Sequence, residues 1–188
     1  MKTNANSLRI GNVIEYQNQL WYLVKREHVK PGKGGAYIQA ELKNISTQTK
    51  TNVRFASSED VEVAYVEQKK FQYQYMDGSE IVAMDMESFD TVNLNKNLAG
   101  DSVAFIQDGM QLTVEYCNSK PISIKLPETV IVKIAMADAV VKGQTATSSY
   151  KPAILENGVR VMVPPFIESG DEIVVKTENA EYFERAKK

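Results

Sequence analysis

The residues best suited to chemistry lie in one short loop, Lys30-Pro31-Gly32-Lys33-Gly34-Gly35, between two strand-like runs. Lys33 carries a primary amine on a long stem, and turn-forming residues surround it. Pro31 stiffens the approach to the loop tip, while the glycines leave Lys33 without competing side chains. Such an ammonium group could enter a narrow RNA cavity and be attracted by its phosphates. Composition alone also fits a plain flexible tip in which Lys33 only adds solubility.

The usual catalytic arrangements are missing from the sequence. His28 is the only histidine and Cys117 the only cysteine, so a nucleophile–histidine pair would have to use His28, which has no nucleophile motif nearby. One histidine and one cysteine cannot form the usual zinc site. The Gly32-Lys33-Gly34 segment lacks the first glycine of a nucleotide-binding loop, and no Ser or Thr follows the lysine. We therefore expect no enzymatic activity, no metal and no organic cofactor.

A carboxylate cluster is the remaining candidate for chemistry. Asp85, Glu87 and Asp90 could hold a metal ion or transfer protons. Period-two spacing predicts that Asp85 and Glu87 share one face of a strand. A solvated rim is the interpretation that we favour for the cluster.

The charge distribution separates the first third of the chain from the rest. The net charge of the whole chain is -2, which argues against a polycation that coats nucleic acid. Lys and Arg outnumber Asp and Glu by nine to six over residues 1–63, but are outnumbered by nine to five over 64–126 and by nine to eight over 127–188. Between Lys25 and Arg54 the excess is seven to two. This pattern fits directed contact with a polyanion, and it also fits a solvated charged face.

Alternating apolar residues predict the strands that must position these groups. The alternation covers residues 36–43, 112–117, 130–134 and 159–163. It places Leu112, Val114 and Tyr116 on one strand face, and Thr113, Glu115 and Cys117 on the other. Turn-forming pairs punctuate the chain at Asp77-Gly78, Asp108-Gly109, Asn157-Gly158 and Ser169-Gly170. The sequence thus predicts an all-β chain of small antiparallel barrels, with short helical turns at 57–60 and 97–105.

The 188 residues allow three very small domains, for which we choose the limits 1–64, 65–127 and 128–188. Barrels of this size have small cores, so we expect them to pack on one another. The most apolar stretch, 130–141, is interrupted by Lys133 and Asp138, so we expect no membrane span. A single cysteine and a first segment without a signal-peptide core suit the cytoplasm. No large apolar face stands out, and we expect a monomer.

Two sets of motifs carry a resemblance to a known family. The loop segment 30–36, after a strand-like start at 10–14, resembles the N-terminal domain of the elongation factor P family. The last third resembles the final domain of that family in order and spacing, and the similarity covers nearly the full chain. The matching segments there are Val141-Lys142-Gly143-Gln144-Thr145-Ala146, Lys151-Pro152-Ala153, Asn157-Gly158-Val159, Val163-Pro164-Pro165-Phe166-Ile167 and Glu181-Tyr182-Phe183-Glu184-Arg185.

The resemblance implies a fold and a function. The family has an N-terminal SH3-like (KOW-like) barrel followed by two OB-fold barrels, in an L-shaped arrangement similar to tRNA. Its members bind the 70S ribosome between the P and E sites and contact the prolyl peptidyl-tRNA in the P site. They stimulate peptide-bond formation and so relieve stalling at consecutive prolines.

The resemblance also implies roles for individual residues. Lys33 would point toward the peptidyl-transferase centre and be the substrate of a lysine-modifying enzyme, commonly one that adds β-lysine. Tyr182 and Arg185 would lie near the P-site tRNA, and Gly143-Gln144-Thr145 near the E-site mRNA codon. The family usually has aspartate at the position of Gln144. The glutamine replaces a carboxylate, which only accepts hydrogen bonds, with an amide that can also donate them. Gly35 replaces a bulkier residue. Without the resemblance, Tyr182 reads as a core aromatic residue and Arg185 as a tail charge.

Three other interpretations remain open at this point. A general single-stranded RNA-binding protein could stack bases on Phe71, Tyr73 and Tyr75, although the acidic middle third argues against it. A relative of the hypusine-containing initiation factor would have two domains and no place for the last third. An enzyme is the least favoured class, because the catalytic groups are missing.

Overall fold

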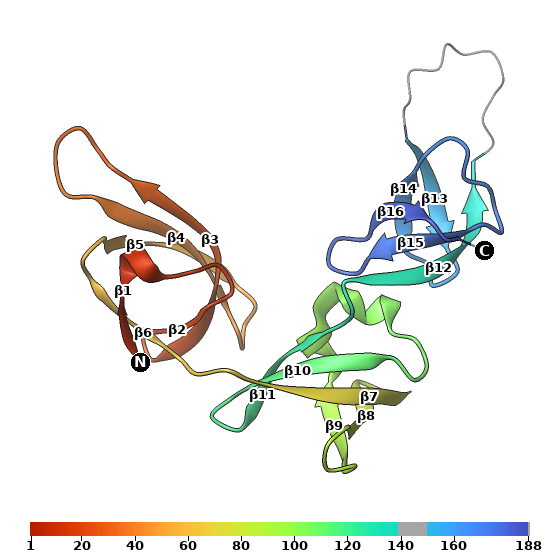
Figure 1. Cartoon of the computed structure of the whole chain (residues 1–188), viewed down its shortest axis with the longest axis horizontal. Coiled ribbons are helices and arrows are strands. Elements are labelled where there is room, and N and C mark those ends of the chain that lie inside the picture. Colours follow the sequence, from red (N-terminus) through yellow and green to blue (C-terminus); the bar gives the residue numbers. More distant parts are fainter. Residues whose placement is uncertain (139–149, 188) are drawn as a thin grey trace. The chain divides into compact units, whose positions relative to one another are not determined.

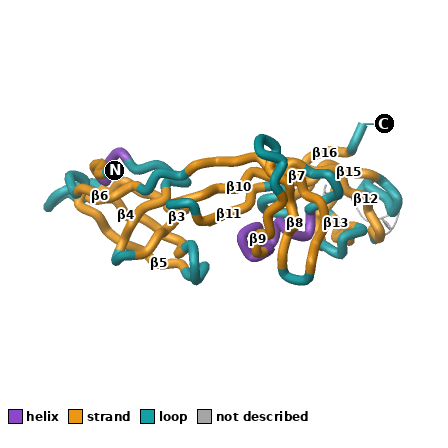
Figure 2. The backbone as a smooth tube through the Cα atoms, turned by 90° about the horizontal axis from the view of Figure 1, so that it is seen from below, coloured by secondary structure: helices purple, strands orange, loops and turns teal. Residues whose placement is uncertain are grey.

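Strands form nearly all of the regular structure, and they build three antiparallel sheets (Figures 1 and 2). The computed structural model describes residues 1–138 and 150–187. The prediction of an all-β chain of small barrels is confirmed. By their contacts the described residues form two compact units, residues 1–68 with 115–122 and residues 69–114 with the rest. The domain limits chosen from the sequence stay a prediction.

The first sheet has the strand order β1-β6-β2-β3-β4-β5. Its core contains alternate residues of β4, namely Ile38, Ala40 and Leu42, which are fully buried as their spacing predicts. The strands are β1 (Lys2–Asn4), β2 (Val13–Tyr16), β3 (Gln19–Val29), β4 (Tyr37–Asn44), β5 (Lys50–Ala56) and β6 (Asp60–Val63).

The second sheet has the order β11-β10-β7-β8-β9. Its strands are β7 (Glu67–Asp77), β8 (Glu80–Asp85), β9 (Thr91–Asn95), β10 (Gln111–Cys117) and β11 (Lys120–Lys125). A 3-10 helix, η2 (Lys96–Phe105), follows β9 and is interrupted at Gly100, where φ is +57°. Phe105 at the end of η2 belongs to the core of the third sheet, so a residue from the middle of the chain completes the last barrel.

The third sheet has the order β14-β13-β12-β15-β16. Its strands are β12 (Thr129–Ala137), β13 (Lys151–Leu155), β14 (Arg160–Val163), β15 (Glu172–Lys176) and β16 (Glu181–Arg185). Val130, Val132 and Ile134 of β12 point into the core, and Val161 and Val163 of β14 do the same. The alternation predicted for these two runs is confirmed.

Strand β10 departs from its predicted alternation after Val114. Glu115 and Cys117 are only 4% and 2% exposed, so beyond Val114 the strand buries the face opposite to that of Leu112 and Val114. The hairpin tip at 115–122 packs on the first barrel, where Cys117 and Ile122 form a cluster with Val13 and Ile45. The buried carboxylate of Glu115 accepts hydrogen bonds from the Tyr22 hydroxyl and the Gln68 amide, both at 3.0 Å. A second partner surface therefore reverses the buried face of this strand.

The helical segments agree only in part with the sequence. The turn predicted at 97–105 is confirmed as η2, whereas 57–60 contains a tight turn and then the start of β6. A short 3-10 helix, η1 (Ala5–Ser7), was not predicted. Among residues 1–138 and 150–187, none of the helices has the length and apolar character that a membrane crossing requires.

Replacing Glu115 tests how strongly the hairpin tip is held on the first barrel. We expect Glu115→Ala to lower the free energy of unfolding by about 1–3 kcal/mol, because the Tyr22 hydroxyl and the Gln68 amide lose the buried acceptor that they share. Glu115→Gln keeps an acceptor oxygen and should cost less. Urea unfolding followed by the fluorescence of Trp21, the only tryptophan, measures both. Exposed Glu87→Ala is the control, and a loss in Glu115→Ala no larger than in this control would contradict the prediction.

The turn after β8 generates a prediction on pH. Strand β8 ends at Asp85, so Glu87 lies in the turn and the two do not share a strand face, contrary to expectation. The backbone N–H groups of Glu87 and Ser88 donate to the Asp85 carboxylate at 2.7 and 3.2 Å and lower its pKa. A lowered folded-state pKa adds stability above the unfolded-state pKa, and this stability is lost as pH falls through the folded-state value.

We therefore expect Asp85→Asn to be less stable than wild type at neutral pH, and the difference to shrink in acid. Thermal melting from pH 7 to below pH 3 measures it. Glu87→Gln is the matched control, because the described structure gives the Glu87 side chain no hydrogen bond or ion pair. A difference for Asp85→Asn that stays constant down to the lowest pH would refute this role.

Candidate functional site

The lysine loop lies at the end of a long hairpin formed by β3 and β4 (Figure 1). The strands pair as far as Val29 opposite Tyr37, and residues 30–36 connect them. A register shift between Leu23 and Lys25 marks a bulge, which changes the face on which the following side chains lie. On β4, the fully buried residue nearest to the tip is Ile38. The paired strands β3 and β4 thus hold the two ends of the loop, and the loop itself is exposed.

Lys33 is exposed at this tip, and its ammonium group makes no hydrogen bond or ion pair within residues 1–138 and 150–187. Every residue from Lys30 to Gly35 is exposed. The nearest ion pair on the hairpin joins Lys25 to Glu27 at 3.0 Å and leaves the loop untouched. The amine is therefore available to a partner or a modifying enzyme.

The glycines around Lys33 differ in what they require. Gly34 has φ of +104°, a left-handed conformation that strains any other residue. A Cβ atom at Gly34 would lie 4.0 Å from Cγ of Pro31, so conformation and not space restricts this position. A Cβ at Gly32 or Gly35 would meet nothing within 4 Å. This chain has Gly35 where the family has a bulkier residue, and this difference therefore leaves the packing of the loop unchanged.

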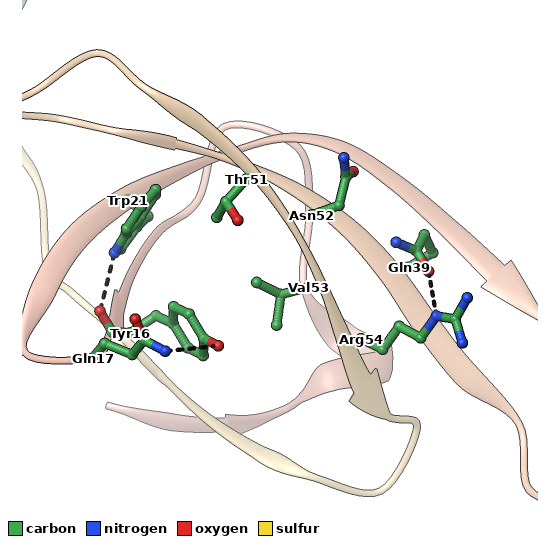
Figure 3. A pocket seen from close by; sticks show the side chains of 8 residues that line it. All are labelled: Tyr16, Gln17, Trp21, Gln39, Thr51, Asn52, Val53 and Arg54. Carbon is green, nitrogen blue, oxygen red and sulfur yellow. Dashed lines mark hydrogen bonds between the residues drawn. The ribbon is translucent and has the colours of Figure 1, made fainter.

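The base of the hairpin has a hollow of about 510 Å³ along the edge strand β5 (Figure 3). Its polar groups bond to one another. Arg54 donates to Gln39 at 2.9 Å and lies 5.2 Å from the centre of the Tyr37 ring. Trp21 donates to the Tyr16 carbonyl at 3.0 Å. None of the lining side chains is a carboxylate, an imidazole or a thiol, so this hollow offers no acid–base group near neutral pH.

Two isolated nucleophile-like groups lack the partners that catalysis needs. The Ser57 hydroxyl lies 3.4 Å from Nε2 of His28, beyond the usual reach for proton transfer; His28 is exposed and Ser57 half-buried. No carboxylate in the described parts of the chain orients His28. Cys117 is buried, and burial, with a smaller contribution from Glu15, raises the pKa of its thiol. A raised pKa disfavours the reactive thiolate.

The carboxylate cluster does not form a metal site. Residues 1–138 and 150–187 contain no group of three or more His, Cys, Asp or Glu side chains placed to hold a metal ion. One oxygen of Asp85 already accepts two backbone hydrogen bonds, as described above. Glu87 and Asp90 are exposed in the turn, so the interpretation as a solvated rim holds for these two.

The aromatic residues of β7 do not form a stacking platform. Phe71 and Tyr73 are 1% and 9% exposed, and burial raises the pKa of Tyr73, with a smaller effect from Asp108. A register shift separates Tyr73 from Tyr75, which is 58% exposed. The first two rings belong to a core, and one exposed ring remains.

The predicted C-terminal site residues lie on the edge strand β16. Tyr182 is half-buried against the core and meets Tyr150 edge to face, with ring centres 6.3 Å apart. Burial is the main cause of its raised pKa, and Tyr150 and Glu184 add to it. Arg185 donates to Asp171 at 2.7 Å, yet its side chain is 56% exposed. Both alternatives for Tyr182 thus have support, since it packs on the core and also lines a surface hollow.

The remaining predicted contact cannot be placed in this structure. Gly143, Gln144 and Thr145 lie outside the described residues. Lys33 belongs to the first unit, whereas Tyr182 and Arg185 belong to the second, and each group is described by itself.

Three family models match successive parts of the chain. Residues 4–61 match the "Elongation factor P (EF-P) KOW-like domain", residues 66–124 the "Elongation factor P (EF-P) OB domain", and residues 130–185 "Elongation factor P, C-terminal". Together they cover all three sheets, including the last third that a two-domain initiation factor would lack.

Similar proteins support the same family over the full length. Elongation factor P of Rickettsia rickettsii (strain Sheila Smith) is 50% identical over 100% of both chains. The proteins of the same name from Chelativorans sp. (strain BNC1) and Zymomonas mobilis are 54% and 53% identical, covering 99% of this chain and 100% of theirs.

One solved structure is similar in fold. The "Eukaryotic translation initiation factor 5A from Methanococcus jannaschii" aligns with a TM-score of 0.54 and 21% identity, over 68% of this chain and 92% of the other. At this identity the likeness concerns the fold alone. With an exposed lysine loop on a KOW-like barrel, two further barrels matched by their own family models, and relatives about half identical from end to end, this chain belongs to the elongation factor P family of translation elongation factors.

Proposed function

We propose that this protein binds the 70S ribosome between the P and E sites, contacts the prolyl peptidyl-tRNA and stimulates peptide-bond formation at consecutive prolines. The observation that carries the proposal is the exposed Lys33 at the tip of the β3–β4 hairpin, whose ammonium group has no hydrogen bond or ion pair among the described residues. Lys33 lies four residues along the chain from both Val29 and Tyr37, the last strand pair, so its backbone reaches at most about 14 Å beyond Val29. The activity belongs to the cytoplasm, where ribosomes translate.

The proposed mechanism is positional. Proline is a rigid and poor substrate for peptide transfer, and a factor that holds the peptidyl-tRNA in a reactive geometry lowers the entropic part of the barrier. Each tenfold rate increase requires only about 1.4 kcal/mol. The ribosome supplies the chemistry, so the factor itself needs no acid, base or nucleophile, in keeping with the isolated His28 and buried Cys117.

The other contacts follow from the family resemblance and from exposure. We assign Arg185 and Tyr182 to the P-site tRNA, since Arg185 keeps free guanidinium N–H groups beside its bond to Asp171. We assign Gly143-Gln144-Thr145 to the E-site codon. We further propose that a lysine-modifying enzyme extends Lys33, whose accessible amine suits such a reaction, and that the protein acts as a monomer.

Removing the Lys33 amine should abolish the stimulation. We expect Lys33→Ala to slow Pro-Pro-Pro formation on purified ribosomes by at least about tenfold relative to wild type, which corresponds to about 1.4 kcal/mol. Its melting temperature should not change, because the exposed side chain makes no hydrogen bond or ion pair in the described structure. The assay compares wild-type protein from its native cell, the variant, and reactions without the factor.

Lys30→Ala is the matched control, because Lys30 is an exposed lysine of the same loop. It should retain most of the stimulation. Full stimulation by Lys33→Ala, or equal losses in the two variants, would overturn the role of Lys33. If wild type does not stimulate, its intact mass decides between a missing modification and a wrong function.

Arg185 provides an independent test on the other unit. We expect Arg185→Ala to reduce stimulation of Pro-Pro-Pro synthesis severalfold, while stability falls by at most about 1 kcal/mol because the arginine of its ion pair with Asp171 is 56% exposed. Lys187→Ala, a nearby exposed cation, serves as the control. Unchanged stimulation by Arg185→Ala would return this residue to a purely structural pairing with Asp171.

A further inference from the structure

A second hollow, of about 660 Å³, lies on the C-terminal barrel beside Tyr182, and its other lining residues have no role in the proposal above. The edge strands β14 and β16 approach one another there, although they are not neighbours in the sheet. Strand β14 contributes Arg160 and Met162 to its lining, and β16 contributes Glu181 and Tyr182. The turn before β16 adds Asn179, and the residue just before β13 is Tyr150.

The hollow lies where barrels of this type bind nucleic acids. In an OB-fold, the second and third strands and the turn between the fourth and fifth strands form the surface that takes oligonucleotides. Here β13 and β14 are the second and third strands, and Asn179 lies in the turn between β15 and β16. The position is therefore suited to a nucleotide, independently of what the side chains are.

The aromatic side chains provide a stacking surface. The Tyr150 ring is 53% exposed, and Tyr182 holds it edge to face at an interplanar angle of 89°. Met162 is 49% exposed beside it. A ring fixed on one side and open on the other can accept the face of a base, and such stacking does not depend on the base sequence.

The polar side chains favour a nucleotide over an apolar peptide. Arg160 is exposed, and in the described parts of the chain it makes no ion pair, not even with Glu181, the one carboxylate of the hollow. The Asn179 oxygen accepts from the backbone N–H of Glu181 at 3.3 Å, which leaves the amide N–H groups to donate. A free guanidinium suits a phosphate, and a free amide suits a base edge.

We propose that this hollow binds one unpaired nucleotide of single-stranded RNA, with its base stacked on Tyr150 and its phosphate paired with Arg160. On the ribosome the RNA would be a segment exposed beside the factor, and only this assignment of a source rests on the proposed function. Because the last third of the chain is nearly neutral, the binding is weak for a free strand and needs a method that detects millimolar affinity.

The test is a titration of the isotope-labelled full-length chain with short single-stranded RNA of mixed sequence, followed by backbone amide chemical shifts. We expect saturable shifts at Met162, Asn179 and Ala180. Tyr150→Ala should raise the dissociation constant at least about fivefold, the lower end of the loss of one stacked base. Arg160→Ala should reduce the slope of log affinity against log salt by about 0.7, the value for one phosphate contact in a single strand.

Matched controls lie on the same barrel but outside the hollow. Phe166→Ala removes a ring that is 61% exposed, and Lys133→Ala removes an exposed cation. Both should bind RNA as wild type does. RNA binding that survives in a protein without proline stimulation would support this site while refuting the proposed function.

The proposal is overturned by the absence of saturable shifts at millimolar RNA, or by equal losses in Tyr150→Ala and Phe166→Ala.

Discussion

The structure depends on sharing apolar surface between neighbouring barrels, because a barrel of about 60 residues buries little surface and is only marginally stable by itself. The first barrel completes its burial with Cys117 and Ile122 from the β10–β11 hairpin, and the last barrel completes its core with Phe105 from η2. Each junction also carries specific polar bonds. Glu115 accepts from Tyr22 and Gln68, and Asn157 donates to the carbonyl of Ala104 at 2.9 Å. The buried Glu115 carboxylate restricts the packing at its junction to one geometry, since any other leaves it without partners, whereas the Asn157 bond is exposed.

This support allows the β3–β4 hairpin to end in an almost bare loop. The base of the hairpin is held by the Gln39–Arg54–Tyr37 contacts and by the ladder up to Val29 and Tyr37, whereas residues 30–35 contact little. Rigid elements place a site more accurately than flexible ones, and an exposed tip can enter a narrow space. A factor that acts by positioning requires a hairpin with ordered, paired strands and an exposed loop. Because the strands are already ordered, less conformational entropy is lost when the loop binds.

The C-terminal barrel combines its functional candidates with packing. In β16, Tyr182 pairs with Val175 and Glu184 with Val174. Phe183 between them has no partner in this register and is the extra residue of a bulge. Tyr182 consequently packs on the core while lining a surface hollow, and Arg185 is held by Asp171. An arginine that is held but still exposed loses less side-chain entropy when it meets a phosphate.

The sequence by itself determined the strands, most of the turns and the exposed lysine tip. These features depend on local chemistry: alternating side chains suit a half-buried strand, and Gly34 suits a left-handed backbone. The family motifs at both ends also identified the site candidates. Only the tertiary structure decided that Glu115 and Cys117 are buried, that Phe71 and Tyr73 belong to a core, and that Tyr150 meets Tyr182 beside Arg160. Burial on the second face of a strand, and contact between segments distant in sequence, depend on which surface lies opposite, and that information is not contained in the spacing of neighbouring residues.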